Sequence, residues 1–251
     1  MVGWVPNRRV QVRAIAVIPA RLASTRLPRK MLHLIAGEPL LAHVVRGVRA
    51  SSLLAEVIVA TDSEEIYSFC EKSGWTARMT SAKHRSGTER VHEVAQAVEA
   101  DVYLNVQGDE PLTRPEHIAS LLEVMREPGV EVGTLKVACP AVDVANPNAV
   151  KVVCEAAGRA LYFSRATVPH DRDGTSPKYF KHLGFYAYRR AALDRFVGWA
   201  ESSLEKAERL EQLRFLENGT EIWVGETAFD TVGVDTLEDA GRVETILLGA
   251  R

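Results

Sequence analysis

The first half of the chain alternates between short apolar runs and segments in which apolar residues recur at helical spacing. Residues 14–18 (AIAVI) form a continuous apolar run, which is typical of a strand buried on both faces of a sheet. Further buried strands are predicted at 57–60 and 102–106. Strands that alternate with helices need right-handed crossovers and a mainly parallel sheet. The sequence therefore predicts an α/β fold whose ligands bind beyond the carboxyl ends of these strands.

Several helices predicted in this half have residues that favour a defined start or end. Pro39 opens the first helix, because proline suits the first helical turn. Asp62 is expected to cap the second helix, which ends at Gly74. Thr113 and Glu116 match a capping box ahead of a further helix. These helices supply the crossovers that a parallel sheet requires.

The second half of the chain has a different pattern. Strands predicted at 150–154 and 180–188 are separated by residues 164–178, a loop rich in proline, glycine and aspartate, and not by a full helix. Antiparallel pairing or a dimer arm is therefore expected there. A long helix is predicted across 204–213, and Thr236 is expected to cap a last helix.

Composition limits the class of protein. The 251 residues suit one α/β domain over 14–251, preceded by an N-terminal extension at 1–13 that lacks the apolar segment of a signal peptide or membrane span. The formal net charge of −2 disfavours a general nucleic-acid surface, so any basic site must be local. The three cysteines lack metal-ligand spacing, which favours reduced thiols in a cytoplasmic protein.

The loop after the first predicted strand is strongly basic. It reads PARLASTRLPRK and holds four cations and no acid between Arg21 and Lys30. Ser24, Thr25 and backbone amides can donate hydrogen bonds to phosphate oxygens. The loop contains neither GxxxxGK nor GxGxxG, so neither a P-loop nor a dinucleotide fingerprint is present. Composition alone leaves a phosphate site and a solvated basic loop equally open.

Two carboxylates follow predicted strands. Asp109 lies in NVQGDEP after the strand at 102–106, and Asp235 lies in VGVDT before the last helix. Mg²⁺ binds through one or two carboxylates together with substrate phosphates, so these residues are candidate ligands. The alternative for Asp109 is an acidic turn. The alternative for Asp235 is a helix cap, which is the better reading when that residue is taken alone.

Two further segments are candidates for binding an anionic ligand. Ser86 and Gly87 open a helix whose N-terminus can face an anion, although an ordinary glycine-containing turn is equally open. Between residues 159 and 190 there are seven lysines and arginines against two acids. Such a local excess of cations in a chain of net negative charge suits an anionic substrate.

Short motifs occur in one order along nearly the whole chain from about Ala14. They are PARLASTRLPRK, MTSAKHRSGTER, NVQGDEP, NPNAVKVV, ALYFSRATVPHDRD, KHLGFYAYR, LEQLRFLENG and GVDT. Together they resemble the 3-deoxy-manno-octulosonate (Kdo) cytidylyltransferases, or CMP-Kdo synthetases. The resemblance implies a three-layer α/β/α fold of the nucleotide-diphospho-sugar transferase type, with a mainly parallel sheet and a small antiparallel subdomain for sugar binding and dimerisation. It implies a Mg²⁺-dependent homodimer that converts CTP and Kdo to CMP-Kdo and diphosphate for lipopolysaccharide synthesis.

The resemblance also implies roles for individual residues. The positions that match nucleotide-binding residues are Arg21, Lys30, Ser86, Gly87 and Gln107. Asp109 and Asp235 match the Mg²⁺ ligands, and with Arg21 and Lys30 they form the expected catalytic set. The positions that match the sugar-acid pocket are Arg165, His182, Tyr186, Glu211 and Gln212. The nucleotide-binding part is expected mainly at 14–140 and 220–251, and the sugar-acid and dimer part at about 141–219.

The chain departs from the family pattern at a few places, and two rival readings remain. Arg29 and Met31 flank Lys30 where the family usually has glycine and proline. CMP-sialic acid synthetase is the nearest rival, but its loop usually continues with glycines after PAR, whereas residues 24–28 (STRLP) favour Kdo. A non-catalytic nucleotide sensor is the rival of another class. It is expected to lose Lys30 or a metal carboxylate, and this chain keeps them.

Overall fold

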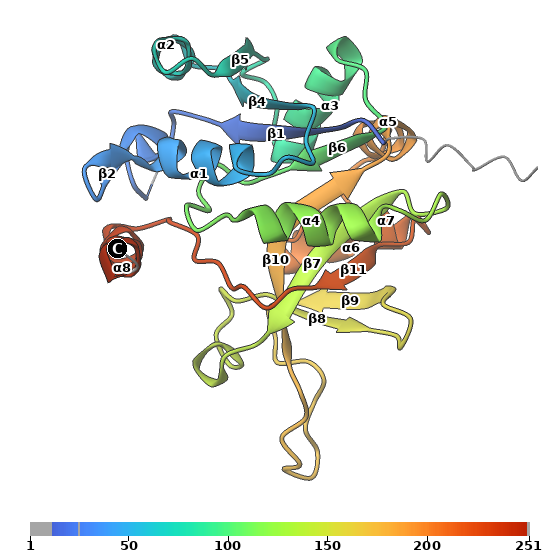
Figure 1. Ribbon diagram of the computed structural model, residues 1–251. Coiled ribbons are helices and arrows are strands. Elements are labelled where there is room, and N and C mark those ends of the chain that lie inside the picture. Colours follow the sequence, from blue (N-terminus) through green and yellow to red (C-terminus); the bar gives the residue numbers. More distant parts are fainter. Residues whose placement is uncertain (1–11, 25, 250–251) are drawn as a thin grey trace, which may run out of the picture.

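The computed structural model describes residues 12–24 and 26–249 and shows helices on both faces of a central sheet (Figure 1). Residues 1–11, most of the predicted N-terminal extension, lie outside the described part of the chain. The main sheet has nine strands, and its continuous path runs β11-β7-β10-β6-β1-β4-β5. These strands are β1 (Ala14–Ala20), β4 (Glu56–Thr61), β5 (Thr76–Met79), β6 (Val102–Asn105), β7 (Val132–Ala138), β10 (Phe180–Tyr188) and β11 (Trp223–Glu226).

The half of the sheet built from the first part of the chain is parallel. β1 pairs in parallel with β4 on one side and with β6 on the other, and β5 extends the sheet from β4. The strands predicted at 14–18, 57–60 and 102–106 are confirmed, with small differences at their ends. Because the strands run in one direction, the loops after β1 and β6 emerge at the same edge of the sheet.

The half built from the second part of the chain contains the antiparallel pairs. β10 lies between β6 and β7 and is antiparallel to both, with a shift in register between Leu183 and Tyr186. A hairpin of β8 (Lys151–Cys154) and β9 (Ala160–Ser164) joins the edge of β10. Figure 1 shows the connection from β9 to β10 extending away from the body of the molecule. The predicted antiparallel pairing is confirmed, and the sheet as a whole is mixed.

Helices cover both faces of this sheet, which gives the predicted three layers. They are α1 (Leu40–Arg49), α2 (Glu64–Lys72), α3 (Gly87–Ala97), α4 (Pro115–Val124), α5 (Arg190–Gly198), α6 (Ser203–Glu208), α7 (Leu213–Glu217) and α8 (Leu237–Gly249). Shorter elements are η1 (Lys30–Leu32), η2 (Ala141–Asp143) and the strand pair β2 (Leu34–Ile35) and β3 (Glu38–Pro39). Within the described ranges, no helix has the length and apolarity needed to cross a bilayer.

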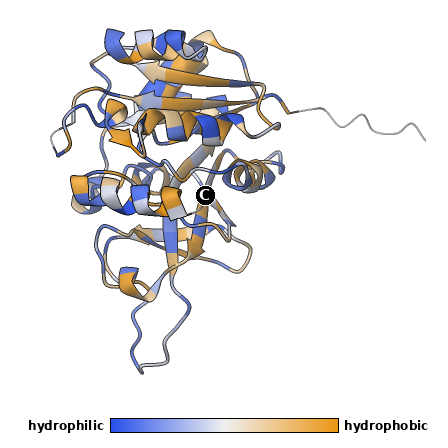
Figure 2. Ribbon diagram, turned by 60° about the vertical axis from the view of Figure 1, so that its left-hand side comes forward, coloured by the Kyte–Doolittle hydropathy of each residue, from blue (hydrophilic) through white to orange (hydrophobic). Residues whose placement is uncertain are grey.

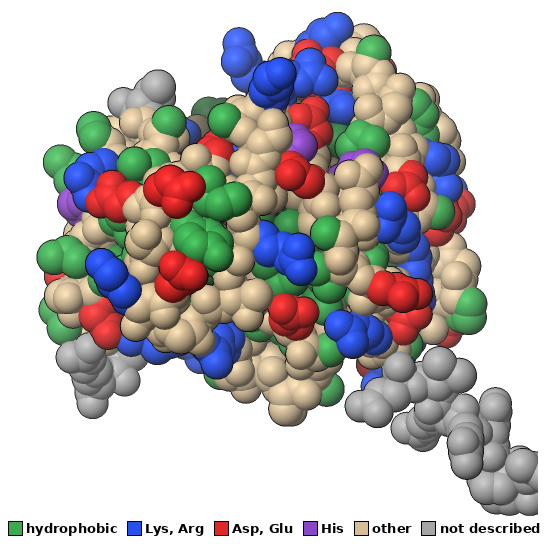
Figure 3. All heavy atoms as spheres, turned by 90° about the horizontal axis from the view of Figure 1, so that it is seen from above, with side chains coloured by type: hydrophobic (Ala, Val, Ile, Leu, Met, Phe, Trp, Pro, Cys, Tyr) green, Lys and Arg blue, Asp and Glu red, His purple; other side chains and the backbone are tan. Residues whose placement is uncertain are grey.

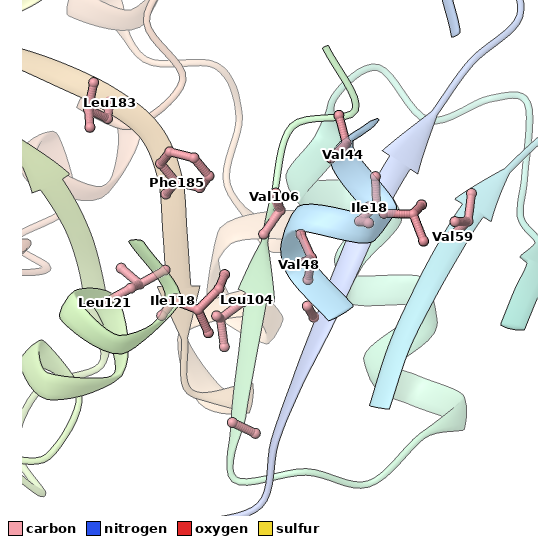
Figure 4. Packing of buried hydrophobic residues seen from close by; sticks show 14 of the residues in the cluster. Ile18, Val44, Val48, Val59, Leu104, Val106, Ile118, Leu121, Leu183 and Phe185 are labelled. Carbon is pink, nitrogen blue, oxygen red and sulfur yellow. The ribbon is translucent and has the colours of Figure 1, made fainter. Parts of the chain in front are cut away.

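Two apolar clusters, one on each face of the sheet, hold these layers together. One cluster joins β1 and β6 to α1 and α4: Figure 4 shows Val44 and Val48 of α1 beside Ile18, and Ile118 of α4 beside Leu104. The other joins the opposite face to α3, α5 and α7. Each fully buried aliphatic side chain contributes about 1.5–3 kcal/mol. Figure 2 shows the corresponding hydrophobic colour along strands of the sheet.

Two of the predicted helix caps are wrong. The second helix is capped by Ser63, whose hydroxyl accepts from the amide of Ile66 at 3.4 Å, while Asp62 pairs with the buried Arg90 at 2.9 Å. Thr113 does not cap α4, because its hydroxyl donates to the carbonyl of Glu110 at 2.7 Å. In each case a tertiary or turn contact takes the side chain that the local pattern assigned to the helix.

The prediction of one long helix across 204–213 is also wrong, because this segment forms two short helices, α6 and α7, joined by a turn. Arg209 ends α6 in the left-handed conformation, with φ of 53°. A buried ion pair between Glu205 and Arg214, with nitrogen–oxygen distances of 2.5 and 2.7 Å, connects the two short helices. The turn between them carries Glu211 and Gln212, so the break places two of the expected sugar-acid residues at a bend and not along one helix face.

Candidate active site

The loops after β1 and β6 meet the segment before α8 around a cavity of about 350 Å³. The cavity lies at the carboxyl ends of the parallel strands, where ligands of such sheets bind. Its lining residues are Pro19, Arg21, Ala23, Ser24, Arg26, Lys30, Met31, Gly87, Gln107, Gly108, Asp109 and Asp235. The structure therefore brings together most of the residues expected to bind the nucleotide and metal. Thr25 lies outside the described residues.

Lys30 lies between the two carboxylates in this cavity. Its Nζ is 2.6 Å from Asp109 Oδ2 and 3.0 Å from Asp235 Oδ1. Burial opposes the charge of Lys30, but attraction and hydrogen bonds from Asp109 and Asp235 outweigh it and raise its pKa. Arg26, one of the four cations of the basic loop, pairs with Asp235 at 2.9 Å. The two carboxylates thus converge on one small cation, with a second cation at the rim.

The backbone fixes the segment that carries Asp235. The amide of Val234 donates to the carbonyl of Asp109 at 2.9 Å. The carboxylate of Asp239 accepts from the amides of Asp235 and Thr236, while the Thr236 hydroxyl accepts from the amide of Asp239. Thr236 caps α8, as predicted. The carboxylate of Asp235 points to Lys30 and Arg26, so the geometry does not support the helix-cap alternative for Asp235.

Gly108 and Arg29 show how tightly the loops approach each other. A Cβ at Gly108 would lie 2.7 Å from the carbonyl oxygen of Pro19 and 2.9 Å from the sulfur of Met31, so only glycine fits there. Arg29 has φ of 56°, in the left-handed region that favours glycine, and its guanidinium pairs with Glu65. Arg29, which stands where the family usually has glycine, is therefore held in a strained backbone conformation.

Arg21 joins the basic loop to the segment that precedes α3. Its guanidinium donates to the carbonyl of His84, and burial together with the charge of Arg90 lowers its pKa. Ser86 caps α3 by accepting from the amide of Glu89 at 3.2 Å. The N-terminus of α3 therefore faces the same cavity as the basic loop, which is the arrangement expected for a site that binds an anion.

A buried polar cluster lies behind Gly87. The hydroxyl of Thr88 donates to Glu211 and lies 3.3 Å from the hydroxyl of Tyr188. A Cβ at Gly87 would lie 3.4 Å from the side-chain nitrogen (Nδ2) of Asn105, at the end of β6. Burial raises the pKa of Glu211, against hydrogen bonds from Ser86 and Thr88 that lower it. Glu211 is thus tied to the N-terminal turn of α3, at the border of the cavity.

Glu211 and Ser86 line a second, neighbouring cavity of about 450 Å³. Its other lining residues are Arg85, Glu89, Glu201, Glu205, Lys206, Arg209 and Arg214. The remaining residues predicted for the sugar acid are not among the lining residues of either cavity. Gln212 is one of them: it is buried, and its amide nitrogen has no partner among the described residues.

His182 and Tyr186 lie on β10 in an apolar surrounding. His182 Nε2 is 2.9 Å from the hydroxyl of Thr134, and its ring contacts Phe163 and Tyr186. Burial lowers the pKa of His182 to about 3 and raises that of Tyr186 far above its usual value. Both side chains are therefore neutral near pH 7. They can offer hydrogen bonds and ring faces to a ligand, but not charge.

Arg165 is held by backbone oxygens. Its guanidinium donates to the carbonyls of Glu208 at 2.7 Å and Pro147 at 3.0 Å, while its own amide donates to the Glu208 carboxylate. The guanidinium therefore links the loop before β8 to the end of α6. Sequence reasoning missed this scaffold role, because Pro147 and Glu208 are remote from Arg165 along the chain.

The donor set for a cation consists of two carboxylates. Among residues 12–24 and 26–249, no group of three or more His, Cys, Asp or Glu side chains is arranged to hold a metal ion. Asp109 and Asp235 nevertheless share one ammonium group, so a cation already has a favourable position between them. Two carboxylate oxygens completed by substrate phosphates are a donor set that suits Mg²⁺.

Comparisons with known proteins agree with this arrangement. The cytidylyltransferase family model matches residues 15–222. The 3-deoxy-manno-octulosonate cytidylyltransferase of Koribacter versatilis is 66% identical over 246 residues, covering 96% of this chain and 94% of that protein. The protein of the same name from Escherichia coli is 44% identical over 236 residues, covering 94% and 96%.

Solved structures show similarity to the same family. A structure of CMP:2-keto-3-deoxy-manno-octonic acid synthetase complexed with CTP matches with a TM-score of 0.91 and 42% identity, covering 95% of this chain and 100% of that one. A 4-diphosphocytidyl-2C-methyl-D-erythritol synthase from Anaerococcus prevotii matches with a TM-score of 0.64 at 14% identity, which supports the fold alone.

Together, the fold, the converging loops and the family match define a nucleotidyltransferase, an enzyme class. The three-layer fold predicted from the motifs is confirmed. The chain belongs to the 3-deoxy-manno-octulosonate cytidylyltransferase family, as the order of its motifs predicted.

Proposed function

We propose that this chain transfers the cytidylyl group of CTP to Kdo, forming CMP-Kdo and diphosphate and so activating Kdo for lipopolysaccharide synthesis. The observation that carries the proposal is the convergence of Lys30, Asp109 and Asp235 in the cavity that also contains Arg21. The relatives named for this reaction match over nearly their whole length. Little covalent chemistry is needed from the protein, because positioning and electrostatic stabilisation dominate phosphoryl-group transfer.

The proposed reaction is an in-line displacement. The anomeric hydroxyl oxygen of Kdo forms a bond to the α-phosphorus of CTP, the bond from that phosphorus to the bridging oxygen breaks, and diphosphate leaves with the bonding electrons. The hydroxyl proton passes to solvent. Arg21 and Lys30 stabilise the charge that develops on the departing phosphates. No side chain is covalently modified, because the substrate hydroxyl is itself the nucleophile.

The nucleotide contacts follow from the lining of the first cavity. We assign the phosphates to the basic loop and the cytidine to the turn at Ser86 and Gly87, where Gly87 lines the first cavity and Ser86 lines its neighbour. Gln107, on the facing loop, is assigned a contact to the nucleotide.

Asp109 and Asp235 would hold a Mg²⁺ ion. The two carboxylates fit this ion because they converge on a single position, which an ammonium group now shares. When bound, Mg²⁺ would neutralise negative charge on the nucleotide phosphates. The chain's own residues keep the carboxylates in register through the hydrogen bond from Val234 to Asp109.

The sugar acid is assigned to the region of Arg165, His182, Tyr186, Glu211 and Gln212. Arg165 supplies positive charge that attracts a carboxylate, while the carbonyls of Glu208 and Pro147 hold its guanidinium in place. His182 and Tyr186 are neutral and apolar-faced. Arg165→Lys is expected to raise KM for Kdo by about tenfold or more, the effect of losing one charged hydrogen bond, with KM for CTP within about threefold. Arg195→Lys, in an exposed pair with Glu131, is the matched control.

We further propose a cytoplasmic homodimer without a nucleic-acid partner. The described cysteines are free thiols, which suits a reducing compartment. The exposed apolar side chains Val142 and Leu161 lie on the part assigned to dimerisation. On the face shown in Figure 3, acidic and basic side chains are interspersed. Light scattering of the purified chain tests the dimer: a monomer at micromolar concentration would contradict it.

The substrate assignment is tested by diphosphate release. The purified chain is supplied with each of the four nucleoside triphosphates and Mg²⁺, together with either Kdo or sialic acid. Diphosphate release is expected only when CTP and Kdo are supplied together. Release with sialic acid but not with Kdo would overturn the sugar assignment, and release with another triphosphate in preference to CTP would overturn the base assignment.

A further inference from the structure

Glu110 is a buried acid that the proposed reaction leaves without a role. It follows Asp109 directly in the loop after β6, yet it is not among the lining residues of the first cavity. Its Oε2 is inaccessible to solvent and has no hydrogen-bond partner among the described residues. An acid buried in this way is costly, so its presence beside the metal carboxylates requires an explanation.

Two glycines from distant segments lie beside the Glu110 carboxyl. A Cβ at Gly184 would lie 3.7 Å from Glu110 Oε1, and so would a Cβ at Gly233. Gly184 occupies the register shift of β10, between His182 and Tyr186. Gly233 directly precedes Val234, whose amide bonds to Asp109, and lies shortly before Asp235. The carboxyl is therefore packed between the strand assigned to the sugar acid and the segment that carries the second metal carboxylate.

The backbone of Glu110 is also held on both sides. Its amide donates to the carbonyl of Gln107 at 3.2 Å, and its carbonyl accepts from the hydroxyl of Thr113 at 2.7 Å. The hydroxyl of Thr231 bonds to its carboxyl. Lys181 holds Thr231 in turn, because its Nζ donates to the Thr231 carbonyl at 3.1 Å. Backbone and side-chain contacts together leave the carboxyl little freedom to move.

We propose that Glu110 is a positioning residue, whose carboxyl sets the distance between the Asp109 loop, the Asp235 segment and the shifted part of β10. This inference rests on the proposed function, since it assigns Glu110 to the spacing of that reaction's metal and sugar sites. The role depends on shape and on the hydrogen bond from Thr231, both of which glutamine retains. Removing a group that supports metal ligands in this way typically costs about 10- to 100-fold in metal affinity or activity.

The test compares Glu110→Ala and Glu110→Gln with the unmodified protein in two measurements. The first is Mn²⁺ binding to the CTP-bound protein, followed by electron paramagnetic resonance. The second is steady-state diphosphate release with Kdo. Glu110→Ala is expected to weaken Mn²⁺ binding about tenfold or more and to lower kcat by about 10- to 100-fold, whereas Glu110→Gln stays within about threefold in both. Glu123→Ala is the control. It removes an exposed acid of α4 that pairs with Arg126 in the following turn, and it is expected to change neither Mn²⁺ binding nor kcat.

Each outcome distinguishes the positioning role from a purely structural one. Circular dichroism and thermal unfolding first establish that the variants are folded. Wild-type Mn²⁺ affinity in folded Glu110→Ala would overturn the proposal. So would losses of Mn²⁺ affinity and kcat in Glu110→Gln that equal those in Glu110→Ala. If Glu110→Ala does not fold, Thr231→Val replaces it, since it removes only the hydrogen bond. About threefold weaker Mn²⁺ binding would then support the role, and unchanged binding would overturn it.

The two measurements also separate this proposal from the proposed function. If the unmodified chain binds Mn²⁺ with CTP but releases no diphosphate with Kdo, the substrate assignment fails, while the Mn²⁺ comparison still decides the role of Glu110. If the unmodified chain releases diphosphate and the Glu110 variants equal it in both measurements, the positioning role fails and the proposed function stands.

Discussion

The backbone amide of Val234 donates to the carbonyl oxygen of Asp109 at 2.9 Å. This single bond joins the loop after β6 to the segment before α8, so the two carboxylates on those segments are held in register even though they are remote in sequence. Lys30 then bridges the carboxylates themselves, at 2.6 and 3.0 Å. The candidate metal site is thus organised by the backbone as well as by charge, and its parts can be removed one at a time.

Removing either carboxylate charge is expected to abolish most of the turnover. Asp109→Asn and Asp235→Asn keep the side-chain shape but weaken cation binding, so kcat should fall by about 100-fold or more, as for the loss of one strong electrostatic stabiliser. Steady-state diphosphate release measures the effect. Asp194→Asn, an exposed acid paired with Arg190, is the control. Near-normal kcat in Asp109→Asn would show that the metal assignment is wrong.

Lys30→Met should make the protein more dependent on Mg²⁺ for its stability. Without the ammonium group, Asp109 and Asp235 repel each other, because Arg26 at the rim is the only other cation that pairs with either of them in the described part of the chain. The variant is expected to have a lower Tm than the wild type in chelator and to gain more Tm on addition of Mg²⁺. A change of 1 kcal/mol corresponds to about 2–4 °C for a chain of this size.

Thermal scans with and without Mg²⁺ at matched ionic strength measure this difference. Lys72→Met, at an exposed position on α2, is the matched control and should respond to Mg²⁺ as the wild type does. An equal Mg²⁺ response in Lys30→Met and in the wild type would show that the ammonium group does not occupy the cation position.

Much of the fold could be predicted, because its signals are local. The apolar run at 14–18 and the helical spacing that follows it require only neighbouring residues, and both are present in the structure. The caps at Asp62 and Thr113 could not be predicted in the same way. Asp62 and Ser63 are both good capping residues, and the choice between them depends on the buried Arg90, which is remote in sequence.

Residues of the candidate site that lie at strand ends could be predicted from the sequence. Residues that tertiary packing brings to the site could not. The loops after β1 and β6 had to emerge together, so Lys30 and Asp109 could be assigned to one site in advance, although their direct ion pair was not predicted. Glu110 could not be recognised, because its partners Gly184 and Gly233 come from distant segments whose approach depends on the shifted register of β10. The end of α6 at Arg209 could not be predicted for a similar reason, because the ion pair that joins α6 to α7 is a tertiary contact.

Arg29 offers a test of backbone strain beside the site. Its φ of 56° favours glycine, and a side chain there costs about 1–2 kcal/mol. Arg29→Gly relieves this strain but gives the unfolded chain more freedom and loses the exposed pair with Glu65, so stability should change by less than about 1 kcal/mol. Arg29→Val should be clearly less stable, because β-branched residues tolerate positive φ poorly. Urea unfolding ranks the variants, and equal stability of the glycine and valine variants would contradict the strain.

The last prediction concerns acid stability and follows from the burial of His182. Burial lowers the pKa of His182 to about 3 in the folded state, whereas an unfolded histidine titrates near 6.5. Between these values the unfolded chain binds a proton that the folded chain does not. The contribution of His182 to stability is therefore complete above about pH 6.5 and is lost as the pH falls toward 3, by at most about 1.4 kcal/mol per pH unit. No charged group is among the causes of this shift, and the ring contacts Thr134, Phe163 and Tyr186.

His182→Gln should consequently lose less stability than the wild type when the pH is lowered from about 7.5 to about 5, whatever its stability at the higher value. The free energy of unfolding, measured by urea titration at both pH values, gives this difference directly. His170→Gln, which changes an exposed histidine of the long connection before β10, should keep the wild-type dependence. If the wild type and His182→Gln lose stability equally, His182 is protonated in the folded protein at pH 5, and its assignment as a neutral hydrogen-bonding group in the sugar-acid region would have to be abandoned.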